Sequence, residues 1–220
     1  MKCKYCDNDT FYILKNGYLK CKKCKRKFSP KKIKQDIKVV KCFCKGLNAL
    51  ECAKKESFHY ITVKNRYDGF RKKIISYNEE CFQGKEVIEY DEYIYLEKSK
   101  KRDKSHIFDA FDFLTFHYED KIYNIIMPDL NIYKNELLTD GADKAYYKEF
   151  ANFMMFNKIS KLQKRDNLIV KFWNYFEKEI LKYKGIKREN FFYYLKEIEF
   201  RFNYDKELCE KILEEICHIS

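Results

Sequence analysis

The first 28 residues alternate short apolar and polar stretches in the pattern of a small β-hairpin. Two apolar runs, residues 11–14 and 18–20, flank the dipeptide Asn16-Gly17, which is a strong signal for a tight hairpin turn. So short a segment buries little apolar surface. We therefore expect a source of folding free energy other than hydrophobic burial to hold it together.

After Ser29-Pro30 the apolar positions take up a helical period. The first predicted helix carries an apolar stripe made of Ile33, Ile37, Val40 and Cys44, and it ends at Gly46. Asn48 is placed to cap a short second helix over residues 49–54. A third helix is predicted over residues 60–75, with an apolar stripe made of Val63, Tyr67, Phe70 and Ile74. A helix, a tight turn, a short helix and a further helix are the order of a helix-turn-helix.

The rest of the chain predicts strands followed by helices. Strands are expected over residues 87–96, 107–118, 121–127 and 137–141. Helices are expected over residues 144–155, 167–182, 190–203 and 206–217, and Phe172, Trp173, Phe176 and Ile180 lie at helical spacing as core residues. This order indicates an α/β or α+β domain. The predicted domains are thus 1–28, 29–80 and 81–220.

Charge separates the N-terminal part of the chain from the rest. The net charge is +12; residues 1–80 hold 22 Lys+Arg against 8 Asp+Glu, a balance of +14, and the remainder holds 24 against 26, a balance of −2. A basic module on a near-neutral body favours an anionic partner, either nucleic acid or an anionic membrane surface.

No apolar window is long enough to span a bilayer. The start, Met-Lys-Cys-Lys, lacks the apolar core of a secretory signal. We therefore expect a cytoplasmic protein whose ten cysteines are thiols or metal ligands.

Four of these cysteines have the spacing of a zinc site. Cys3 and Cys6 form one CxxC pair, and Cys21 and Cys24 form another. Zn²⁺ takes four thiolates at the corners of a tetrahedron, and each CxxC turn presents two of them. Four protein ligands leave no open position for catalysis, so the predicted zinc is structural. The other six cysteines lack paired spacing and are expected to be small core residues.

The third predicted helix carries the polar side chains expected of a DNA reader. These are Lys64, Asn65, Arg66, Arg71 and Lys72. In a helix-turn-helix this helix enters the major groove. The side chains of Asn65 and Arg66 can form hydrogen bonds with base edges. Contacts with phosphates are expected from Lys64, Arg71 and Lys72. The alternative is a plain three-helix bundle with a solvated basic face.

Two aspartates in the body are candidates for a catalytic metal site. Asp91 lies in the first predicted strand, and Asp140 lies at the end of a later one. Carboxylates that meet at one edge of a sheet can hold two Mg²⁺ ions for phosphoryl transfer. The alternative is that both are ordinary surface charges among the 34 acidic residues of the chain.

The order of these segments resembles bacterial insertion-sequence transposases of the DDE type that begin with a zinc ribbon and a helix-turn-helix. IEYDEYIYL is similar to the family's first-aspartate strand, LLTDGADKAYY to its second-aspartate segment, and NLIVKFWNYF to the helix with the third catalytic position. GIKRENFFYYLKEIEFRFNY is similar to the closing segment and is the most specific match.

The resemblance implies a ribonuclease-H-like mixed sheet with helices in the body. It also implies Mg²⁺-dependent cleavage at transposon ends, joining of the new 3′-hydroxyl to target DNA, and at least a dimer on DNA. Asp91, Asp140 and Asn167 then take the catalytic positions. Val170 stands where the family often has Glu, while Asp166 and Glu177 share its helix face. The alternative functions are two. One is a catalytically inactive DNA-binding protein or transcriptional regulator derived from a transposase, and the other is a different zinc-ribbon regulator whose body only oligomerises.

Overall fold

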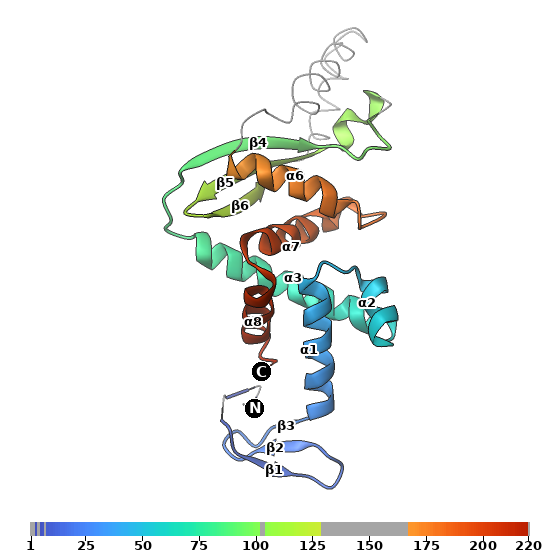
Figure 1. Cartoon of the computed structure of the whole chain (residues 1–220), viewed down its shortest axis with the longest axis vertical. Coiled ribbons are helices and arrows are strands. Elements are labelled where there is room, and N and C mark those ends of the chain that lie inside the picture. The colour runs from blue at the N-terminus through green and yellow to red at the C-terminus, as the bar shows by residue number, and fades with distance from the viewer. Residues whose placement is uncertain (1–2, 4, 7, 102–103, 129–166, 220) are drawn as a thin grey trace. The chain divides into compact units, whose positions relative to one another are not determined.

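The computed structural model describes residues 3, 5–6, 8–101, 104–128 and 167–219 (Figure 1). These residues form a mixed α/β protein with two small antiparallel sheets, and the chain divides into two compact units. Unit 1 is Met1–Cys81 together with Glu179–Ser220, and unit 2 is Phe82–Lys178. The segment 179–220 thus joins the N-terminal part, whereas the sequence assigned it to the body.

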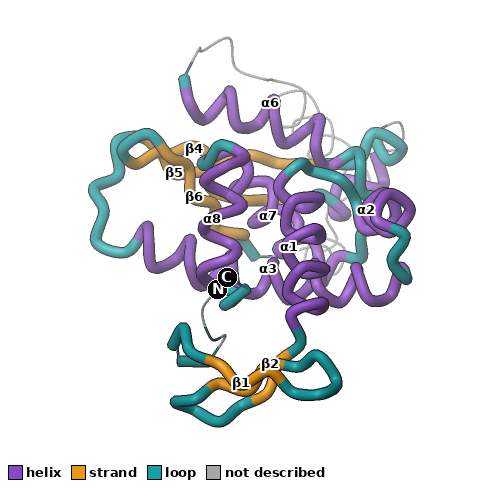
Figure 2. Tube along the Cα trace, turned by 60° about the horizontal axis from the view of Figure 1, so that its bottom comes forward, coloured by secondary structure: helices purple, strands orange, loops and turns teal. Residues whose placement is uncertain are grey.

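A three-stranded antiparallel ribbon begins unit 1 (Figure 2). Its strands are β1 (Phe11–Ile13), β2 (Leu19–Cys21) and β3 (Lys27–Phe28), in the order β1-β2-β3. Asn16-Gly17 lies in the predicted hairpin turn, where Gly17 has a φ of 76° that favours glycine. Phe11 packs edge-on against Phe28 at 5.3 Å between ring centroids.

Three helices follow the ribbon: α1 (Pro30–Cys44), α2 (Ala49–Glu56) and α3 (Tyr60–Phe82). Ser29 caps α1 by accepting a hydrogen bond from the N–H of Lys32. Asn48 caps α2 in a full capping box with Glu51, which confirms the predicted start of this helix. The predicted stripe of α3 is buried, and the helix continues past residue 75. In this longer part Asn78 is buried and donates to Glu199 of the C-terminal segment.

The remaining helices of unit 1 come from the other end of the chain. They are α7 (Phe191–Asn203), preceded by the 3-10 turn η3 (Arg188–Asn190), and α8 (Lys206–Ile216). α8 packs against α1, and buried Phe200 and Leu213 join the same apolar cluster as Phe43 and Tyr67. This shared cluster explains why residues 179–220 belong to unit 1.

Unit 2 contains an antiparallel sheet in the order β4 (Glu89–Tyr95), β5 (Phe111–Tyr118) and β6 (Lys121–Ile126). The aromatic residues of α6 (Leu168–Ile180) pack on one face of this sheet: Trp173 lies 4.7 Å from Tyr93 and Phe176 lies 5.4 Å from Phe113 between ring centroids. The core assignment of this helix is confirmed.

The chain just before β5 differs from the predicted strand. Residues 107–110 were expected to begin β5, but Lys104–Asp109 forms the 3-10 helix η1. The carboxylate of Asp109 is bound by Lys100 and His106, and such local side-chain bonds compete with strand pairing. The strand predicted over 137–141 and the helix over 144–155 lie outside the described residues. The described strands all pair antiparallel, and none of the described helices is long and apolar enough to cross a bilayer.

Candidate metal centre and basic surfaces

The four predicted zinc ligands lie together at the base of the ribbon. The sulfur atoms of Cys3, Cys6, Cys21 and Cys24 all lie within 4.8 Å of one another. The Cys3–Cys24 and Cys6–Cys21 sulfur pairs are each 3.6 Å apart. Tetrahedral Zn²⁺ with Zn–S bonds of about 2.3 Å separates its sulfurs by about 3.8 Å. This cluster can therefore hold a metal ion such as zinc.

The backbone shapes both CxxC turns around this centre. The N–H of Cys6 donates to the carbonyl of Cys3, and the N–H of Lys25 donates to the carbonyl of Cys21. Lys25 adopts a left-handed φ of 61° to close the second turn. Cys3 and Cys21 are fully buried, while Cys6 and Cys24 are partly exposed. Solvent therefore reaches two of these four residues and not the other two.

The two buried thiols differ in acidity. Burial raises the pKa of Cys3 to about 12, and hydrogen bonds with the neighbouring thiols, Cys24 foremost, add to the effect. Burial also opposes ionisation of Cys21, but the backbone N–H of Cys24 and the thiol of Cys6 donate to its sulfur and lower its pKa to about 6. The lowered pKa of Cys21 favours its thiolate, which is the form that binds a metal ion, whereas binding through Cys3 must displace a proton.

Helix α3 presents its predicted DNA-reading residues unequally. Lys64, Asn65 and Lys72 are exposed, and Lys64 pairs with Asp68 at 3.4 Å. The guanidinium of Arg66 donates to Asp36 of α1 at 2.7 Å, and its side chain is only 16% exposed. Asn65 and Arg66 nevertheless line one groove, which Lys32, Asp36, Thr62, Gly69, Phe70, Lys73, Cys217 and Ile219 also line.

Arg71 does not belong to the exposed face, and its assignment as a phosphate contact was wrong. Its side chain is 5% exposed, and its Nε donates to the carboxylate of Glu197 on α7 at 2.8 Å. Its Nη1 donates to Asp68 at 2.8 Å, and its guanidinium stacks 4.1 Å from the ring centroid of Tyr194. Arg71 is a buried structural cation, because its Nε and Nη1 are bonded to carboxylates of α7 and α3 within unit 1.

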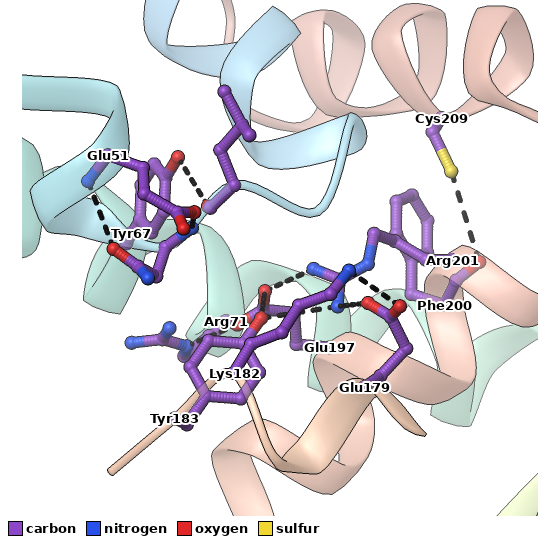
Figure 3. Close-up of polar contacts among 12 residues, drawn as sticks. Glu51, Tyr67, Arg71, Glu179, Lys182, Tyr183, Glu197, Phe200, Arg201 and Cys209 are labelled. Atoms are coloured by element: carbon purple, nitrogen blue, oxygen red, sulfur yellow. Dashed lines mark hydrogen bonds and ion pairs between the residues drawn. The ribbon is translucent and has the colours of Figure 1, made fainter. Parts of the chain in front are cut away.

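Sequence reasoning also missed the charge cluster around this arginine. Figure 3 shows Glu197 between Arg71 and Arg201, and Arg201 continues to Glu179 at 3.1 Å. Glu179 in turn accepts from Lys182 at 2.6 Å, and Tyr183 donates to Glu197. Burial opposes ionisation of Glu197, but Arg201 and Arg71 hold its pKa below the usual value. The cluster therefore stays charged and holds α3, α7 and the segment before α7 together.

The catalytic candidates are only partly within the described residues. Asp91 lies on β4 opposite Thr115 of β5, and its carboxylate accepts from the N–H of Glu92. Asn167 caps α6 by accepting from the N–H of Val170, and its amide donates to Glu89 at 2.7 Å. Asp140 and Asp166 lie outside the described residues.

Glu89 is a residue that the sequence reasoning overlooked. It lies two positions before Asp91 on the same strand, so both side chains point to the same face of the sheet. Because Asn167 bonds to Glu89, the start of α6 lies beside the strand that carries Asp91. Val170, which stands where the family often has Glu, is buried, and Glu177, one of the two alternatives for the third position, accepts from Tyr93 at 2.8 Å.

Comparisons with protein-family models, with curated proteins and with solved structures find no match to this chain. Function is therefore inferred from the residues and contacts described above.

Proposed function

We propose that this chain is a duplex-DNA-binding protein in which a zinc ribbon supports a helix-turn-helix. The observation that carries the proposal is the groove beside α3, where Asn65 and Arg66 lie with Lys32 and Lys73. Asn and Arg side chains match the hydrogen-bonding edges of adenine and guanine in the major groove. Lysines around them supply the phosphate contacts that fix a helix on the duplex.

The ion pair between Arg66 and Asp36 bears on the mechanism of binding. Asp36 holds the guanidinium in place before DNA arrives, so less side-chain entropy is lost on binding. The same carboxylate competes with DNA for the arginine. We therefore expect phosphate contacts to supply most of the binding free energy, and Arg66 to contribute specificity for the base sequence.

Two measurements test this proposal. The first selects binding sites from a randomised duplex library, and the second titrates the selected duplex over a range of salt concentrations. Arg66→Ala is expected to relax the preference at one base position, and Lys73→Ala, at the same groove, to weaken binding equally for all sequences. Lys98→Ala, an exposed lysine of unit 2, is the control and leaves both unchanged. Affinity that does not depend on salt would contradict groove docking, because phosphate contacts release counterions.

A second candidate function, DDE-type transposition, is favoured by one observation in unit 2. Asn167 at the start of α6 reaches the strand of Asp91 through Glu89, which brings two of the three family positions to one side of the sheet. In this proposal the body is a ribonuclease-H-like domain, Asp91 and Asp140 are metal-binding carboxylates, and Asn167 orients the site. Mg²⁺, when bound, would activate the nucleophile and stabilise the leaving oxygen.

Strand cleavage at flanking terminal repeats in Mg²⁺ or Mn²⁺ tests this second function. The parent is expected to cleave, and Asp91→Asn to lose cleavage while its DNA affinity is retained. Asp120→Asn, an exposed aspartate in the turn between β5 and β6, is the matched control. Equal cleavage by the parent and by Asp91→Asn would remove the catalytic assignment and leave a DNA-binding protein. Joining two DNA ends also requires at least two copies of the chain, which the mass of the DNA complex would report.

A further inference from the structure

The ribbon sheet has one apolar face and one basic face. Phe11 pairs with Cys21 and Leu19 pairs with Phe28 across the strands, and these side chains face the metal centre and the core. Successive residues in a strand point to opposite faces. The neighbours of those residues, which are Tyr12, Lys20 and Lys27, therefore form the opposite, open face of the sheet.

The charges on this open face repel one another. Lys20 and Lys27 are direct cross-strand partners, and like charges at such positions destabilise a sheet. Tyr12 pairs with Lys20 on the other side and is 50% exposed. Among the described residues of the ribbon, neither lysine forms an ion pair. An arrangement that costs folding free energy on an open surface indicates an anionic partner.

Two more lysines are held over the same surface. The Nζ atoms of Lys22 and Lys25 lie 5.3 Å and 5.9 Å from the ring centroid of Tyr12, within the range of cation–π attraction. Lys25 takes its left-handed φ of 61° where glycine would be unstrained. Tyr12 thus gathers two ammonium groups beside the Lys20–Lys27 pair.

The cations of the ribbon differ from several of those on α3 in having no carboxylate partner. In α3, Lys64, Arg66 and Arg71 each have a carboxylate partner within unit 1. In the described part of the ribbon, Lys15, Lys20, Lys22, Lys23, Lys25, Arg26 and Lys27 have none. Among the described residues of α3, Lys72 and Lys73 are likewise exposed without such a partner. The ribbon therefore adds a second group of unpaired cations, which can exchange counterions for phosphates, to those of α3.

We propose that the open face of the ribbon, formed by Tyr12, Lys20, Lys22, Lys25 and Lys27, binds the phosphodiester backbone of duplex DNA. This inference rests on the proposed DNA-binding function and adds a second contact surface to it. Lys20 and Lys27 contact phosphates directly, and Tyr12 positions Lys22 and Lys25. The ribbon is then a binding element as well as a metal-stabilised support.

The test measures duplex affinity of the zinc-loaded full chain over a range of salt concentrations. The double variant Lys20→Gln and Lys27→Gln is expected to bind about 10- to 30-fold more weakly near physiological salt, for every sequence, and to lower the salt slope by about 1.8. The matched control is Lys98→Gln with Lys178→Gln, two exposed lysines of unit 2, and it leaves the slope unchanged. Zinc content equal to that of the parent verifies that the ribbon is folded.

Two variants of Tyr12 test the positioning role. Tyr12→Phe keeps the ring face and is expected to bind like the parent, whereas Tyr12→Leu loses the ring and binds more weakly. Equal binding by both variants would contradict this role.

The outcomes separate the two proposals. If the parent binds DNA with a steep salt slope and the Lys20/Lys27 variant has the same affinity and slope, the binding role of the ribbon face is refuted. The proposed DNA-binding function then stands. If the parent does not bind duplex DNA, both fail. Weaker binding of the variant to phosphatidylserine vesicles, with unchanged binding to DNA, would also overturn the inference.

Discussion

Arg71 of α3 and Glu197 of α7 form an ion pair of 2.8 Å across 126 residues of sequence. Both side chains are buried, at 5% and 0% exposure. A buried charge is costly unless it is paired and hydrogen-bonded. This pair therefore favours one packing of α7 against α3, because breaking it leaves each of the two buried charges with one partner fewer.

Arg71→Met is expected to lower the free energy of unfolding by about 3–5 kcal/mol, because it leaves the carboxylate of Glu197 buried with one cation fewer. Chemical denaturation monitored by circular dichroism measures the change. The exposed neighbour Lys72→Met is the control and shifts stability by no more than about 0.5 kcal/mol. Equal effects of the two substitutions would contradict the structural role of Arg71.

Stability is expected to fall in acid because of Glu197. Its pKa in the folded chain is held low by Arg201 and Arg71 against the effect of burial, so folding favours the ionised form. That contribution is complete above the ordinary glutamate pKa of 4.5 and is lost as the pH falls below it. Melting temperatures over a series of pH values measure the loss. Glu197→Gln should flatten the dependence, whereas Glu207→Gln, on the exposed face of α8, should keep it.

If the cysteine cluster holds a metal ion such as zinc, its removal by a chelator is expected to unfold the ribbon and to leave the helices of unit 1 in place. The substitution Cys21→Ser is expected to do the same. Metal binding supplies most of the folding free energy of such a small segment. Amide resonances of residues 8–28 should lose their dispersion, and the metal content should fall from one ion per chain. Cys81→Ser, outside the cluster, should retain the metal. A ribbon spectrum that does not change on chelation would refute the metal centre.

Thr115→Val is expected to destabilise unit 2 by about 1–3 kcal/mol, although the two side chains have the same shape. The buried hydroxyl of Thr115 donates to Asn124 at 2.8 Å and accepts from the indole N–H of Trp173 at 2.9 Å. Valine leaves that N–H without its acceptor. Thr115→Ser keeps the hydroxyl, so its unfolding free energy should stay closer to that of the parent. The prediction fails if serine costs as much as valine.

Local patterns predicted the features that depend on neighbours in sequence. The CxxC pairs, the Asn48 cap and the apolar stripe of α3 are each determined by residues within a few positions, and the structure confirms them. The strands of unit 2 were found for the same reason, apart from the segment where Asp109 binds Lys100 and His106.

Long-range pairing was not visible in the sequence. Whether Arg71 faces solvent or the core depends on Glu197, which lies on a helix far along the chain. One signal was present: Arg71 follows Tyr67 by four positions and precedes Ile74 by three, so it shares their buried face of α3. The basic face of the ribbon was likewise hidden until the register paired Lys20 with Lys27.

Unit 1 is built from two segments that are far apart in the chain, so its parts are synthesised at different times on the ribosome. Its first 81 residues are translated early, but the helices that cover them, α7 and α8, emerge only after all of unit 2. The nascent chain therefore exposes the apolar side of α1 and α3 while residues 82–178 are being made. A chaperone that shields apolar helices during that interval would raise the yield of the native protein, and a chain stopped at residue 178 would aggregate.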